Sequence, residues 1–172
     1  MSIMFTRRLT RACVLASLLL ASTAGTASAQ WSRHHASACS PMSTELQASY
    51  YVSSPGVSNT STTTPLYLSC PSFDTSEQPD SQLNEVRVYV YDGSSTDGVE
   101  VKACIVFRDG TGNACSSIVS TSHAFVGYAM LTLDATALAQ WDTTDFGYLN
   151  VKVPARSGAL GFSWVKGIVA TQ

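Results

Sequence analysis

The fold is decided by residues 99–115, which read VEVKACIVFRDGTGNAC. In the first nine of these residues the odd-numbered positions are apolar, while Glu100 and Lys102 point to the opposite face. A period of two with one apolar face predicts an antiparallel strand that covers a core. Asp109-Gly110 then provides a dipeptide that favours a two-residue hairpin turn, because such a turn needs positive φ at both central residues. The stretch therefore predicts a β-hairpin.

This hairpin also favours one pairing of the cysteines. If Asp109-Gly110 is the turn, the numbers of opposite residues sum to 219, so Cys104 faces Cys115. We expect a hydrogen-bonded pair with Cα atoms about 5.5 Å apart, a separation that a disulfide can span. Four cysteines follow residue 29, and the sequence alone leaves three pairings open. The hairpin favours Cys104–Cys115 and thereby Cys39–Cys70; free or metal-bound pairs are the alternative, without a C-x-x-C spacing to support them.

Short β-rich runs separated by turn residues continue along the chain. Of its 172 residues, 45% are hydrophobic and 13% charged, a composition that argues against intrinsic disorder. Eight strands are predicted, at 48–53, 66–69, 84–91, 99–107, 114–120, 125–133, 147–153 and 160–170. The predicted fold class is all-β, a jelly-roll-like sandwich of two antiparallel sheets, with one domain over 44–172. One short helix is expected from Asp134 to Trp141, and residues 30–43 are expected to be an irregular N-terminal segment.

The first 29 residues predict a cleaved signal peptide. Arg7, Arg8 and Arg11 precede a short apolar run, and Ala27-Ser28-Ala29 offers a cleavage site. The run is about half the ~20 residues that a membrane span needs, so we expect a secreted or periplasmic protein with no span after processing. Removing 29 of the 172 residues leaves 143, with 7 basic and 12 acidic side chains and a net charge of −5. This charge argues against nucleic acid as a partner.

Three carboxylates surround the tight loop after the predicted strand 84–91. They belong to Asp92, Asp97 and Glu100. Calcium takes six to eight oxygen ligands, and loops of this kind often supply several, so one hypothesis is a calcium site. The alternative is a strand-connecting turn whose Asp and Gly residues serve the backbone geometry. No other cofactor is expected.

A second candidate site is a stripe on the same strand. Arg87, Tyr89 and Tyr91 alternate there with three valines. If the valines face the core, the other three side chains form an exposed polar and aromatic stripe that suits a ligand or a partner. Ordinary cross-strand packing of the tyrosines is the alternative.

Patterns typical of catalysis are missing from the sequence. His123 is not accompanied by a G-x-S-x-G elbow, and no pair of glutamates is marked as facing a cleft. Glycine patterns for phosphate or dinucleotide binding are absent as well. A non-catalytic role is therefore favoured over an enzymatic one.

Two short motifs follow the signal peptide, Ala38-Cys39-Ser40-Pro41 and Ser69-Cys70-Pro71, and a strand rich in Val and Tyr comes after them. In this pattern the chain resembles uncharacterised secreted bacterial β-sandwich proteins. Its Val90-Tyr91-Asp92-Gly93 step is similar to CUB-like sandwiches. Neither resemblance assigns a functional residue. We expect an exported non-catalytic sandwich that binds a surface glycan or an extracellular protein; the alternatives are a structural or assembly subunit of the cell envelope and, third, a secreted hydrolase.

Overall fold

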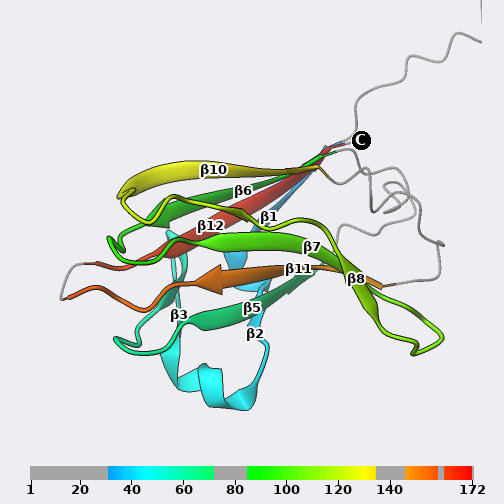
Figure 1. Ribbon diagram of the computed structural model, residues 1–172, viewed down its shortest axis with the longest axis horizontal. Helices are drawn as coiled ribbons and strands as arrows, with labels where there is room; N and C mark the ends of the chain where they lie inside the picture. Colours follow the sequence, from blue (N-terminus) through cyan, green and yellow to red (C-terminus); the bar gives the residue numbers. More distant parts are fainter. Residues whose placement is uncertain (1–30, 72–84, 135–145, 159–160, 172) are drawn as a thin grey trace, which may run out of the picture.

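Two antiparallel β-sheets pack face to face in the computed structural model (Figure 1). The structure describes residues 31–71, 85–134, 146–158 and 161–171. The prediction of an all-β sandwich is confirmed. The predicted signal peptide and residues 135–141 of the predicted helix lie outside the described residues, whereas Asp134 is the last residue of a strand.

The first sheet, sheet A, is built around its central strand β12. Its members are β1 (Trp31–His35), β3 (Tyr50–Ser53), β4 (Gly56–Asn59), β6 (Glu85–Asp92), β10 (Gly127–Asp134) and β12 (Trp164–Thr171). The strand order is β10-β6-β12-β4-β3. β6 pairs along one edge of β12, and β4 and β1 share the other edge, β4 beside Trp164 and Val165 and β1 beside residues 167–171.

The second sheet, sheet B, has the order β2-β5-β11-β7-β8, and β9 pairs with β7. Its members are β2 (Ser40–Pro41), β5 (Leu66–Pro71), β7 (Glu100–Val106), β8 (Asn113–Cys115), β9 (Val119–Ser120) and β11 (Phe146–Val153). Two 3-10 turns, η1 (Ala36–Ala38) and η2 (Thr44–Ser49), lie between the first strands. Most connections cross from one sheet to the other, as in a jelly roll.

The core lies between the inner faces of the two sheets. On β6, the side chains of Val86, Val88 and Val90 are buried, and Leu68 on β5 and Val151 on β11 meet them from sheet B. The predicted alternation of β6 is thereby confirmed. The side chains that alternate with these valines, those of Glu85, Arg87, Tyr89 and Tyr91, consequently lie on the outer face of sheet A.

Three strands were not predicted from the sequence. β1 and β2 lie within residues 30–43, which are therefore not irregular throughout, and β4 was not expected either. β1 shows no alternation because it lies at the sheet edge, where Arg33, His34 and His35 are all exposed. β4 shows none because all four of its residues are buried. The predicted strand 114–120 is divided between β8 and β9.

Both predicted disulfides are present. Cys39 is bonded to Cys70, and Cys104 to Cys115. The first bridge joins the segment after η1 to β5, and Cys39 also accepts a hydrogen bond of 2.7 Å from the Tyr50 hydroxyl through its carbonyl oxygen. Burial raises the pKa of that hydroxyl. The first bridge therefore ties the N-terminal segment to sheet B, and the second joins β7 and β8, the two strands of the hairpin.

The hairpin has the predicted register but a different turn. Asp109 does not have the positive φ that a two-residue turn needs, since every described residue with positive φ is a glycine. Instead, the Phe107 N–H donates to the Gly112 carbonyl at 3.0 Å, which closes a loop of four residues. The longer loop keeps the same opposite residues but moves the hydrogen-bonded pairs by one position. Cys104 and Cys115 consequently form a non-hydrogen-bonded pair with Cα atoms 4.0 Å apart.

Reduction of the two disulfides should lower the melting temperature by at least about 10 °C, because the chain-entropy model assigns them about 2.8 and 3.7 kcal/mol. Their sequence separations are 11 and 31 residues. Calorimetry of protein refolded with and without reductant measures the shift. The double variant Cys104→Ser/Cys115→Ser separates the shorter bridge from the longer one. An unchanged melt in reductant would contradict the prediction.

Candidate functional site

Asp92, the first carboxylate of the calcium hypothesis, is completely buried at the end of β6. Its Oδ1 accepts hydrogen bonds from the Ser94 N–H at 3.0 Å and from the Ser163 hydroxyl at 2.9 Å. Its Oδ2 accepts from the Val99 N–H at 3.4 Å and from the Thr121 hydroxyl. Ser163 precedes a strand of sheet A, whereas Val99 and Thr121 flank strands of sheet B. The carboxylate therefore links both sheets at one end of the sandwich.

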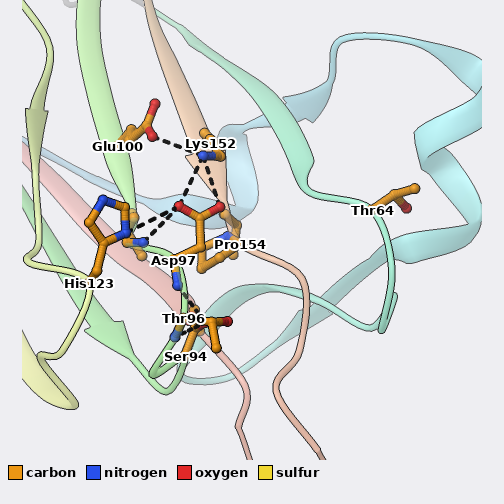
Figure 2. A network of polar contacts seen from close by, with 12 residues as sticks. Thr64, Ser94, Thr96, Asp97, Glu100, His123, Lys152 and Pro154 are labelled. Atoms are coloured by element: carbon orange, nitrogen blue, oxygen red, sulfur yellow. Dashed lines mark hydrogen bonds and ion pairs between the residues drawn. The ribbon is translucent and has the colours of Figure 1, made fainter.

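The carboxylates of Asp97 and Glu100 do not point toward Asp92; both contact the Lys152 ammonium (Figure 2). The Lys152 Nζ lies 2.9 Å from the Asp97 Oδ2 and 2.8 Å from the Glu100 Oε1. The ring of His123 is 78% exposed, and its Nδ1 lies 3.8 Å from the Asp97 Oδ1. Burial acts to lower the pKa of Lys152, but the hydrogen bonds and negative charges of Glu100 and Asp97 outweigh it and raise this pKa.

The three carboxylates therefore do not share a site. Protein donors occupy both oxygens of Asp92, and Lys152 lies between the other two carboxylates. Within the part of the chain that the structure describes, no group of three or more His, Cys, Asp or Glu residues is placed to hold a metal ion. The geometry fits a strand-connecting turn: a Cβ on Gly98 would lie 2.4 Å from the Thr121 carbonyl oxygen, so the loop needs glycine there. In the described residues, the three carboxylates of the calcium hypothesis therefore do not converge on one point.

The outer face of sheet A carries a row of aromatic side chains. Tyr51, Trp164, Tyr91 and Tyr128 lie in register on β3, β12, β6 and β10, and we call them the aromatic row. The ring centroids of Tyr91 and Tyr128 are 5.0 Å apart, and those of Tyr51 and Trp164 are 6.4 Å apart, both pairs edge to face. Tyr128 is 71% exposed and Tyr51 53%. At about 4.8 Å between strands, the row spans about 19 Å.

A serine lies beneath the row. In the register, Ser58 on β4 stands between Tyr51 and Trp164. Its side chain is completely buried, and its Oγ has no hydrogen-bond partner among the described residues. Phe162 continues the aromatic surface beyond Trp164, with a centroid distance of 6.1 Å. A small residue on β4 thus lets the two large rings meet above it.

A groove of about 730 Å³ adjoins the aromatic row on the same face. Its floor and walls come from three neighbouring strands: Gly167 and Val169 on β12, Arg87 and Tyr89 on β6, and Arg33 and His35 on β1. Lys166 also lines the groove and connects it to the row, because its Nζ lies 4.4 Å from the centroid of the Tyr128 ring. The row and the groove form one continuous surface.

The prediction from the sequence identified part of this surface and missed the rest. All three residues of the predicted stripe lie on it, Tyr91 in the row and Arg87 and Tyr89 in the groove. Trp164 and Tyr128 were missed. The alternation of β10, where Leu131 and Leu133 are buried, would have placed Tyr128 outward. No such signal existed for Trp164, because the pairing of β12 with β6 shifts between Val165 and Gly167.

Asp92→Asn should lower the free energy of unfolding by about 1–3 kcal/mol, since an amide cannot accept all four hydrogen bonds of the buried carboxylate. Chemical denaturation measures the change. Asp109→Asn is the matched control, because Asp109 is exposed and its replacement keeps an acceptor for Thr111. Equal effects of the two variants would show that Asp92 does not hold the sheets together.

Lys152→Met should lower the free energy of unfolding by about 1 kcal/mol near neutral pH, as it removes both ion pairs. The folded state binds the lysine proton more tightly than the unfolded chain does, because the pKa of Lys152 is raised above 10.5. Its contribution is therefore complete below about pH 10.5 and is lost as the pH rises through the folded-state pKa. Urea unfolding of wild type and variant between about pH 8 and 11.5 tests whether the stability difference between them shrinks as the pH rises. A stability difference that grows with pH would contradict the prediction. Lys102→Met is the control for the loss of a lysine as such.

No protein-family model matches the sequence, and no curated protein matches it significantly. A solved structure that resembles the chain is "Carbohydrate-Binding Module CBM36 in complex with calcium and xylotriose". The identity is 11%, the match covers 82% of this chain and 99% of that one, and the TM-score is 0.39. In the described part of the chain, no helix is long and apolar enough to cross a membrane.

Proposed function

We propose that the protein is an exported, non-catalytic β-sandwich that binds a surface glycan through the outer face of sheet A. The aromatic row is the observation that supports this proposal most directly. Tyrosine and tryptophan offer a flat apolar ring together with a polar tip. Sugar rings have the complementary character, with apolar C–H faces and hydroxyl groups at the edges. A row of exposed rings therefore suits a chain of sugars that lies across the strands.

Rigidity supports the same function. The rings of the aromatic row contact one another in pairs, and each is carried by a strand instead of a loop. Side chains that are already ordered lose little conformational entropy when a ligand binds. The row is thus arranged as a binding surface before any ligand arrives.

Two features support a location outside the cytoplasm. The disulfides Cys39–Cys70 and Cys104–Cys115 persist in oxidising compartments, and cytosolic proteins rarely keep such bridges. The first 29 residues have the sequence pattern of a signal peptide. A secreted or periplasmic protein is positioned to meet glycans of a cell surface.

Trp164→Ala and Tyr128→Ala should each weaken glycan binding at least about ten-fold, the effect expected when an aromatic anchor of an interface is removed. A glycan array followed by titration of the best ligand gives the affinities. Tyr67→Ala is the matched control, because Tyr67 is 39% exposed but lies on β5 of sheet B. It should leave the affinity unchanged.

Two outcomes would overturn the proposal. A blank array together with a blank pull-down from envelope extracts would remove the glycan ligand. Equal losses for Tyr67→Ala and Trp164→Ala would remove the outer face of sheet A as the binding surface. Light scattering that shows an assembly of many copies without glycan would favour the alternative of an envelope assembly subunit.

A further inference from the structure

The groove beside the aromatic row concentrates positive charge. Beyond residue 30 the chain has 7 Lys and Arg against 12 Asp and Glu. Three of the seven, Arg33, Arg87 and Lys166, line this groove; no described Asp or Glu lines it, although Glu85 is ion-paired with Arg87. His34 and His35 line it as well. A cationic groove on a protein of net negative charge is complementary to an anionic ligand.

The contacts of two cations leave donors available to a ligand. Arg87 donates its Nε–H to Glu85, and no described residue accepts from its two Nη groups. The Lys166 ammonium lies above the ring of Tyr128, and no described carboxylate lies within ion-pair distance of it. Arg87 and Lys166 therefore combine charge with unused donors, Lys166 where the groove meets the aromatic row and Arg87 further along the groove, beyond Tyr89.

A glycine gives the groove its depth. Gly167 lies between Tyr89 on β6 and His35 on β1 in the register. The groove therefore has no side chain at this central position. A Cβ added there would lie 3.2 Å from the His34 carbonyl oxygen, a tight contact. The volume of about 730 Å³ falls within the range of small-molecule sites, about 300–1,000 Å³. The groove therefore has room for part of a sugar chain.

We propose that the groove binds the carboxylate groups of an acidic polysaccharide, a chain of uronic acids, while its sugar rings stack on the aromatic row. This inference rests on the proposed function and names its ligand class. The planar fork of an arginine matches a planar carboxylate through two parallel hydrogen bonds. Lysine adds a point charge at the junction with the row. The cations select the acidic sugar, and the rings supply contact area.

Calorimetric titration with polygalacturonate and with its fully methyl-esterified form tests the inference, because the two polymers share a backbone and differ in charge. Wild type should bind the acid form about ten-fold more tightly, the effect of one charge-assisted hydrogen bond. Lys166→Gln and Arg87→Gln should lose this preference and keep the affinity for the ester. Lys102→Gln, on β7 of the opposite sheet, should keep the preference. Thermal melts of each variant verify folding.

The outcomes separate this inference from the proposed function. Equal affinity of wild type for acid and ester would overturn the acidic ligand and leave glycan binding intact. Binding to dextran sulfate but not to polygalacturonate would overturn the carboxylate as the recognised group. Equally tight binding to polyglutamate would show a site for any polyanion and overturn the sugar. Binding to no glycan at all would overturn the proposed function itself.

Discussion

The β-bulge between Val165 and Gly167 decides which side chains of β12, the central strand of sheet A, lie on the outer face. Without it, strict alternation would place Val165 and Gly167 on the same face. With one extra residue between them, Val165 and Ile168 are buried, while Trp164 and Gly167 both lie on the outer face. The bulge also restricts the neighbouring strand β4 to glycine at position 56, because a Cβ there would lie 2.0 Å from the Val165 carbonyl oxygen. The aromatic row and the groove thus depend on a single irregularity in the central strand.

The polar groups of the molecule divide between structure and recognition. Asp92 is buried, and a buried carboxylate is tolerated because donors from both sheets satisfy it. Lys152 lies between Asp97 and Glu100, so these two carboxylates also contribute to the fold through their ion pairs with Lys152. The loop of the calcium hypothesis therefore links strands of the two sheets through these contacts. The proposed binding surface, the outer face of sheet A, uses none of these carboxylates.

Local pattern predicted the regular part of the fold. Alternation identified β6, β7 and β11, because each buries one face, and the symmetry of the hairpin gave the Cys104–Cys115 bridge although its loop is longer than expected. β1 and β4 were not predictable in this way, since their pairing with β12 depends on residues more than 100 positions away. Trp164 was missed for a related reason. A bulge is a property of the paired strands, and one strand's sequence does not reveal it.

If the proposed function holds, the two parts of the candidate surface contribute differently to binding. Charges at an exposed site act over a Debye length of about 8–10 Å and are weakened by salt and water. Burial of ring surface is much less sensitive to salt, because it depends on the apolar area removed from water. Affinity for a sugar chain should therefore come mainly from the aromatic row, and discrimination among sugars from Arg87 and Lys166. Lys166 joins the two parts, since its ammonium lies against the ring of Tyr128 while it lines the groove. In the proposed binding mode, an acidic sugar places its ring on the row and its carboxylate in the groove at the same time.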